Sequence, residues 1–257
     1  MRSTPFIALD AHAAGSSSLG ALPAVPARVE QTYRALLEAI VSGELRPGER
    51  HTQEGLAQRL GVSRQPILQA LLLLRRQGLI KDEPGRYGIE VNPLTRHFVG
   101  QLYAVRGALD ALAARSAAQH PTAALLSEGR QLIAAGRAAA GRGDLGPLVD
   151  ADIAFHRFIY AAAGNALLTE TTEVHWLHTR RTMATYLRAV DTLQTIWTEH
   201  EAILDAITRG DAQAAERLAR EHCEHSAGML LDALPDASLT QTPTLTDSPT
   251  EIIQEPT

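Results

Sequence analysis

Four residues of metal-binding types occur at spacings that could place their side chains around one ion. Asp152 and His156 are four residues apart, so on a helix they lie on the same face, one turn apart. His200 lies ten residues before Gly210, and His222 lies twelve residues after it. If the helices on either side fold back at this glycine, a rise of about 1.5 Å per residue places the two imidazoles nearly level.

One carboxylate and three imidazoles form a ligand set that suits Zn²⁺, Ni²⁺ or Mn²⁺. Four protein ligands leave one or two positions open on a five- or six-coordinate ion, and a carboxylate effector could fill them. The alternative is that these are separate surface or core histidines, because histidine is often partly buried in proteins. Spacing alone does not separate the two interpretations.

Three further histidines have roles that the sequence leaves open. His225 follows His222 by almost one helical turn and is either a neighbour that supports the ligands or a surface residue. His175 and His178 share a helix face and either line a pocket or face solvent. We do not expect any of the three to bind the metal.

A second set of residues has the types that read DNA. A recognition helix enters the major groove with its first residues near base edges. There arginine suits guanine or a phosphate, glutamine suits adenine, and serine with the free N–H groups of the first turn suits a phosphate. The candidate DNA contacts are Ser63, Arg64, Gln65, Pro66 and Gln69, with Gly85 and Arg86 in a turn that could reach a neighbouring groove. The alternative is an ordinary helical hairpin with exposed polar residues.

The surrounding sequence predicts the elements that hold these DNA contacts. Apolar spacing predicts a helix over 29–41, Thr52 caps a short helix to Leu60, and Ser63 caps another helix to about Gln77. Two short apolar runs, 79–80 and 89–91, bracket a Pro/Gly turn and predict a hairpin. This order is that of a winged helix-turn-helix.

From Pro93 the apolar pattern is helical almost to Leu234, with breaks that indicate about six helices packed as a bundle. We expect a mostly α fold in which a winged helix-turn-helix precedes an all-helical domain. The predicted segments are a disordered tail at 1–26, a DNA-binding domain at 27–92, a helical effector-binding and dimerisation domain at 93–235, and a second disordered tail at 236–257.

Composition agrees with a globular α-rich protein. Of the 257 residues, 45% are hydrophobic and only 4% are aromatic, so we expect Leu, Ala, Val and Ile to form the core. No apolar run is long enough for a membrane span, the start has no signal-peptide pattern, and a single cysteine fits a reducing cytoplasm. Residues 27–92 contain ten basic and eight acidic side chains, whereas residues 93–257 contain 13 basic and 20 acidic ones. The first domain is therefore the less acidic one.

The N-terminal motifs closely resemble those of the GntR family of regulators. The similar stretches are LRPGER at 45–50, LAQRLGVSRQPILQAL at 56–71 and GLI at 78–80. The family pattern usually reads SRTPVREAL, so this chain has Leu68 in place of an arginine that commonly contacts DNA, and Gln69 in place of a glutamate. The resemblance implies operator binding, with readout left to Arg64, Gln65 and Arg86.

The second half is similar to the FCD ligand domain of the FadR subgroup. The similar features are LYAVRGALD at 102–110, Asp152 four residues before His156, and His200 with His222. The metal-binding branch of that domain uses an aspartate and three histidines at these places. The resemblance also implies that Arg106 lies near the effector carboxylate, and an ion pair with Asp110 is the other interpretation of this arginine.

Together these features predict a homodimeric transcription regulator that is not an enzyme. A small organic acid bound at the metal and Arg106 would change the affinity for operator DNA. Dimerisation is expected because one winged unit buries little DNA surface. The alternatives are a regulator for which the metal is the signal, a metal-dependent hydrolase or isomerase, and a metal-free binder of fatty acyl ligands.

Overall fold

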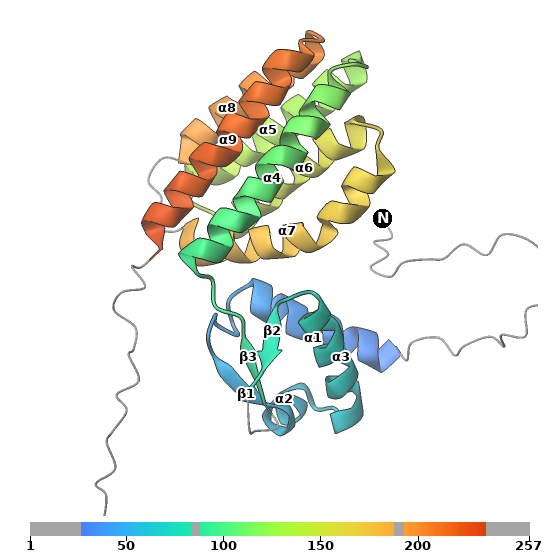
Figure 1. The fold of residues 1–257 in the computed structure, drawn as a ribbon, viewed down its shortest axis with the longest axis vertical. Coiled ribbons are helices and arrows are strands. Elements are labelled where there is room, and N and C mark those ends of the chain that lie inside the picture. The colour runs from blue at the N-terminus through green and yellow to red at the C-terminus, as the bar shows by residue number, and fades with distance from the viewer. Residues whose placement is uncertain (1–26, 84–87, 188–192, 235–257) are drawn as a thin grey trace, which may run out of the picture.

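The computed structural model describes residues 27–83, 88–187 and 193–234 and divides them into a small N-terminal unit and a larger helical domain (Figure 1). The tails predicted at 1–26 and 236–257 lie outside the described residues. So does the turn at 84–87, which contains Gly85 and Arg86. The described part is mostly α-helical, as the sequence predicts.

The described N-terminal unit contains three helices and a three-stranded sheet. Its elements are α1 (Ala27–Val41), β1 (Arg50–Thr52), α2 (Gln53–Leu60), α3 (Arg64–Arg76), β2 (Ile80–Asp82) and β3 (Gly88–Val91). All strand pairs are antiparallel, in the order β1-β3-β2. The helix, helix-turn-helix and hairpin order predicted from the sequence is confirmed.

Local hydrogen bonds set the turn between α2 and α3. The Thr52 hydroxyl accepts a hydrogen bond from the Gly55 N–H at 3.0 Å and caps α2. Gly61 ends α2 with a φ of 62°, a left-handed conformation that glycine adopts without a steric penalty. Ser63 occupies the N-cap position of α3, but its hydroxyl makes no capping hydrogen bond there.

Strand β1 is not predicted from the sequence. Its three residues are exposed or half-buried and lead directly into α2, so they carry no apolar alternation of their own. Pairing with β3 alone defines the strand, with Arg50 opposite Glu90 and Thr52 opposite Gly88.

An apolar core fixes α3 against α1. Ile67, Leu71 and Leu74 of α3 belong to one cluster with Leu36 and Ile40 of α1, and none of these side chains is more than 3% exposed. Full burial of such a side chain stabilises the fold by about 1.5–3 kcal/mol. The opposite face of α3 is therefore held toward solvent.

Six helices make up the described part of the second domain. They are α4 (Arg96–Ala117), α5 (Ala123–Arg142), α6 (Leu145–Ala162), α7 (Ala166–Tyr186), α8 (Leu193–Thr208) and α9 (Ala212–Ala233). The breaks predicted near Pro121, Gly164 and Gly210 fall between helices. Residues 188–192, between α7 and α8, lie outside the described residues.

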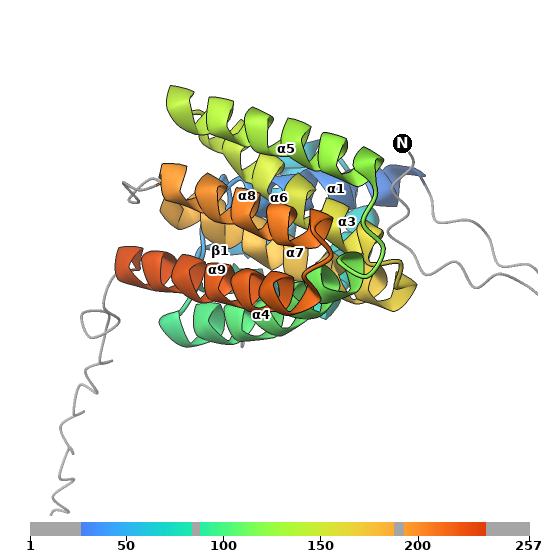
Figure 2. The same ribbon diagram turned by 90° about the horizontal axis from the view of Figure 1, so that it is seen from above.

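Close packing of α5 on α8 positions part of the functional site. A Cβ atom on Gly136 would lie only 2.0 Å from the Trp197 ring, so a glycine is required for this approach. Trp197 is 1% exposed, and its ring centroid lies 4.8 Å from that of His200. Figures 1 and 2 show α4 and α9 side by side on another side of the bundle.

Helix α7 runs along the side of the helical domain that faces the N-terminal unit (Figure 1). Leu177 packs against the core of the N-terminal unit. The same helix contributes Trp176 to the interior of the helical domain. One helix therefore contacts both parts of the molecule through neighbouring residues.

Candidate functional site

The four residues predicted as metal ligands converge inside the helical domain. Asp152 and His156 come from α6, His200 from α8 and His222 from α9. One ligand atom from each residue lies within 4.8 Å of the others. None of the four is more than 3% exposed. The fold-back at Gly210 places His200 and His222 together, as the sequence predicts.

The inner ring nitrogens face a common point. His200 Nε2 lies 3.2 Å from His156 Nε2 and 3.2 Å from His222 Nε2. Asp152 Oδ1 lies 3.5 Å from His200 Nε2 and 3.9 Å from His156 Nε2. Two imidazole nitrogens bound to one ion at about 2.0–2.1 Å, at right or tetrahedral angles, are about 2.8–3.4 Å apart. The nitrogen spacing therefore fits a divalent transition-metal ion.

Carboxylates fix the tautomers of two of these histidines. His156 Nδ1 lies 3.2 Å from Asp110 Oδ2, and His222 Nδ1 lies 2.8 Å from Glu199 Oε2. A carboxylate accepts, so each Nδ1 donates its hydrogen and each Nε2 presents a lone pair. The single His200 Nε2 between them can donate to only one of these lone pairs. The cluster therefore has an excess of inward-facing acceptors, which favours a bound cation.

The environment keeps two of the imidazoles in the neutral form that binds metals. Burial lowers the pKa of His200 well below its ordinary value, and nearby His222, His156 and Arg106 lower it further. Burial also lowers the pKa of His222, although its hydrogen bond to Glu199 opposes that shift. Oδ2 of Asp152 has no hydrogen-bond partner among the described residues.

Asp110 connects the ligand cluster to its surroundings, a role that the sequence analysis missed. It accepts hydrogen bonds from Tyr160 Oη at 2.7 Å and Cys223 Sγ at 2.9 Å, besides its contact with His156 Nδ1. Burial alone would raise the pKa of Asp110, but His156 and Arg106 hold it below its usual range. The spacing of four residues between Arg106 and Asp110 was the sequence signal that could have indicated that both side chains lie on the same buried face of the helix.

Glu199 is the second functional residue that the sequence analysis missed. Its two oxygens contact His222 Nδ1 and His225 Nδ1. Burial raises the pKa of Glu199, but the hydrogen bonds from these histidines outweigh it and lower the pKa. His225 is thus a neighbour that supports a predicted ligand. The sequence signal for this role was the position of Glu199 next to His200, opposite His222 and His225 in the pair of helices that meet at Gly210.

Arg106 lies beside the cluster and is 3% exposed. Its Nε lies 3.3 Å from Asp110 Oδ2, and its Nη2 lies 3.7 Å from Asp152 Oδ2. The ion pair with Asp110 is therefore present. Neither Nε nor Nη2 has a hydrogen-bond partner of good geometry within the described ranges. The guanidinium retains donors for an acidic group.

A small cavity adjoins Arg106. Its volume is about 10 Å³, which is room for about one water molecule. The lining residues are Tyr103, Arg106, Asp152, Met183, Leu187, Ile196, Ser226, Met229 and Leu230. A ligand larger than water would require this cavity to expand.

His175 and His178 lie on α7, away from the four-residue cluster. His178 Nε2 lies 2.9 Å from the carbonyl oxygen of Gln77, and its ring packs edge-on against Phe98. Arg181 donates a hydrogen bond to the carbonyl oxygen of Asn92. The two α7 side chains His178 and Arg181 therefore tie the helical domain to the end of α3 and to the segment after β3.

The predicted DNA contacts lie at the N-terminal end of α3. Ser63, Arg64, Gln65 and Gln69 are exposed there. Pro66, also predicted as a DNA contact, is buried in the first turn of α3, where its fixed φ helps to begin the helix. Gly85 and Arg86 lie outside the described residues.

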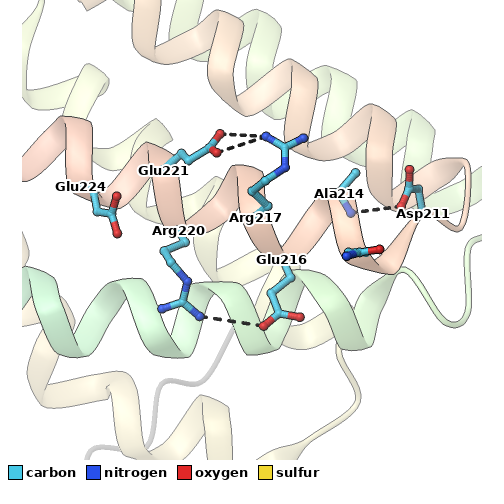
Figure 3. Close-up of a pocket in the computed structure, with 8 residues that line it drawn as sticks. Asp211, Ala214, Glu216, Arg217, Arg220, Glu221 and Glu224 are labelled. Carbon is cyan, nitrogen blue, oxygen red and sulfur yellow. Dashed lines mark hydrogen bonds and ion pairs between the residues drawn. The ribbon is translucent and has the colours of Figure 1, made fainter.

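An open depression on the surface of α9 is a separate feature (Figure 3). Its charged side chains pair with each other, as in Arg217 with Glu221 and Arg220 with Glu216. Asp211 caps the helix by accepting from the Ala214 N–H. These pairs satisfy the charges along one helix face, so this surface is a solvated helix face and we assign it no ligand.

A winged helix-turn-helix joined to a helical domain is typical of a DNA-binding regulator. Family models agree with this class. Residues 28–91 match the model "Bacterial regulatory proteins, gntR family", and residues 101–225 match the FCD domain. The chain belongs to the GntR family and is a DNA-binding transcriptional regulator of the GntR/FCD type. None of the described helices is long and apolar enough to cross a membrane.

Named relatives are regulators of the helix-turn-helix type. The chain is 28% identical to the transcriptional repressor RspR of Escherichia coli, over 76% of this chain and 85% of RspR. A regulator from the TAR-I region of Agrobacterium vitis is 30% identical, over 53% of this chain and 81% of that protein. YdhC of Bacillus subtilis is 40% identical over 83 residues, which is only 37% of YdhC.

Solved structures share the fold. McbR/YncC of E. coli superimposes with a TM-score of 0.68 at 21% identity, over 81% of this chain and 99% of that chain. A GntR regulator from Rhodococcus sp. RHA1 gives a TM-score of 0.67 at 22% identity, with the same two coverages. At these identities the likeness describes the arrangement of elements.

Proposed function

We propose that this protein is a homodimeric sensor whose affinity for operator DNA is set by a small organic acid bound beside a metal ion in the helical domain. The observation that carries the proposal is the buried cluster of Asp152, His156, His200 and His222. Carboxylates orient two of its histidines, and Arg106 lies next to it. Such a cluster inside a domain joined to a DNA-binding unit suits ligand sensing.

The four clustered side chains would hold the ion, and Asp110 and Glu199 would keep His156 and His222 in the ligating tautomer. A bound divalent ion supplies Lewis acidity toward a carboxylate oxygen. The donor set of three nitrogens and one carboxylate suits zinc first, and nickel or manganese next.

Arg106 would hold the acid by its remaining donors, because a guanidinium pairs with a carboxylate through parallel hydrogen bonds. The adjoining cavity of about 10 Å³ is too small for an organic acid, so binding requires an expanded arrangement of α7, α8 and α9. An effector that binds only the expanded arrangement shifts the population toward it.

Helix α7 supplies a physical route from the sensor cluster to α3. The Trp176 ring lies 5.9 Å from the His156 ring, and the Arg106 guanidinium lies 5.5 Å from Trp176. One and two residues further, Leu177 packs into the N-terminal core and His178 contacts Gln77 at the end of α3. A shift of α7 would therefore move the reading helix, or the two reading helices of a dimer relative to each other.

A direct test combines metal analysis with operator binding. Wild-type protein should carry metal, and His200→Ala should lower the metal content per subunit in elemental analysis. His120→Ala, an exposed histidine outside the cluster, is the control and should retain the metal. Full metal occupancy in His200→Ala would remove this residue from the proposed site.

The effector role of Arg106 is tested by Arg106→Lys, which keeps the buried charge but lacks the planar fork of donors. Operator DNA is first selected from a random library, and small organic acids are then screened for release of that DNA. The variant should lose effector response while its metal content and operator affinity stay near wild type. A loss of operator affinity with a normal effector response would contradict the assignment.

A second candidate is that the metal ion itself is the signal, which the small cavity favours. In that case metal removal changes operator affinity as much as any acid does, and no acid adds to it. The family assignment favours regulation over the metal-dependent hydrolase or isomerase considered from the sequence.

A further inference from the structure

The exposed face of α3 combines positive charge with apolar side chains. Residues Arg64, Leu68, Leu72 and Arg76 follow each other at four-residue intervals, so they form one ridge along the helix. Leu68 and Leu72 are each 45% exposed, and they are the large apolar side chains exposed in the described N-terminal unit. We call these four residues the α3 ridge.

The core does not account for these two leucines. Ile67, Leu71 and Leu74 already supply the buried face of α3 and are at most 2% exposed. A solvent-facing row of a short helix is usually polar, because exposing a large apolar side chain loses the gain from its burial. Leu68 and Leu72 are therefore placed for contact with something outside the chain.

The charge of α3 indicates a polyanion as that partner. The helix sequence RQPILQALLLLRR contains three arginines and no acidic residue. The neighbouring row on the same exposed side carries Gln65 and Gln69. Glutamine pairs with adenine in the major groove, and apolar side chains contact the C5-methyl group of thymine. Both rows thus suit A·T base pairs.

We propose that Leu68 contacts thymine methyl groups in the operator. Leu72 makes the next apolar contact along the major groove, and Gln65 or Gln69 reads the adenines paired with these thymines. At a rise of about 1.5 Å per residue, Leu68 and Leu72 lie about 6 Å apart, well within a groove about 12 Å wide. Arg64 and Arg76 flank the leucines and face the phosphates. This inference rests on the assignment of α3 as the DNA-reading helix.

The test replaces thymine by deoxyuridine, which removes only the C5-methyl group. An operator is selected from random DNA with the full-length protein, each thymine is then replaced in turn, and the dissociation constant is measured by fluorescence anisotropy. Replacing one particular thymine per half-site should raise the dissociation constant of the wild-type protein about fourfold. This factor corresponds to losing the burial of one methyl-sized group.

Leu68→Ala is the decisive variant. It should bind the thymine operator about as weakly as wild type binds the deoxyuridine operator, and it should no longer distinguish the two DNAs. Leu112→Ala removes an exposed leucine of α4 and should keep the wild-type discrimination. A Leu68→Ala protein that still discriminates at the same position would overturn the proposal.

Other outcomes locate the error. If wild type binds its operator and responds to effector but senses no methyl group, this inference fails while the proposed function stands. If Leu68→Ala instead changes the oligomeric state in analytical ultracentrifugation and leaves DNA binding intact, the α3 ridge is a protein interface. If no DNA is selected above background, α3 reads no sequence and both proposals fail.

Discussion

The start of α3 and the buried surroundings of the four-residue cluster use similar polar residues in opposite environments. At the start of α3, Ser63, Arg64 and Gln65 face solvent on top of an apolar core. In the helical domain, Arg106 and Asp110 are 3% exposed and form an ion pair inside the bundle. An exposed polar group is replaced at little cost in folding, whereas a buried charge that loses its partner is costly. Mutations at the start of α3 should therefore change mainly DNA binding, whereas mutations of the buried charged residues should change mainly the stability of the fold.

The largest expected effect comes from Asp110→Ala. The change leaves the Arg106 charge and the Tyr160 hydroxyl without their buried acceptor, and breaking such a pair costs about 3–5 kcal/mol. The free energy of unfolding, measured with urea, should fall by that amount. Asp232→Ala on the exposed side of α9 is the control and should stay within about 0.5 kcal/mol. Equal stability of the two variants would contradict the buried network.

Metal removal should have the next largest effect. A ligand present at one hundred times its dissociation constant stabilises the native state by about 2.7 kcal/mol, so chelation should lower the unfolding free energy by about that much. Added zinc should restore it. The same treatment should leave His200→Ala unchanged and should affect His120→Ala as it does wild type. A chelator effect that persists in His200→Ala would place the metal elsewhere.

Arg64→Ala should change DNA binding and leave folding intact. Loss of a base or phosphate contact costs about 1–3 kcal/mol of operator affinity. The melting temperature should stay at the wild-type value, because the side chain is exposed. Arg130→Ala, an exposed arginine of α5, should alter neither quantity. Unchanged operator affinity in Arg64→Ala would remove the reading role from this end of α3.

The smallest effect is expected on the outer surface of α9 (Figure 3). Arg217 pairs with Glu221 at 3.0 Å, and both side chains are more than half exposed. Exposed pairs of this kind contribute about 0.3–0.5 kcal/mol on a helix. Arg217→Ala should therefore stay within that range in urea unfolding and keep wild-type effector release. A large loss of effector response would give this depression a role that its paired charges do not indicate.

Much of the fold followed from local signals in the sequence. Thr52, Gly61 and Gly210 mark helix ends by capping and left-handed backbone, which depend on neighbouring residues only. β1 did not follow, because its three residues become a strand only by pairing with β3.

For the candidate sites, the sequence by itself determined which side chains share a helix face. Asp152 with His156, and the level placement of His200 and His222 about Gly210, follow from the helical repeat alone. Tertiary structure decided which atoms face one another across helices. It brought Asp110 to His156 and Glu199 to His222, buried Pro66, and turned His178 toward Gln77 instead of a pocket. These contacts join residues distant in the chain, so only the packing of whole helices could fix them.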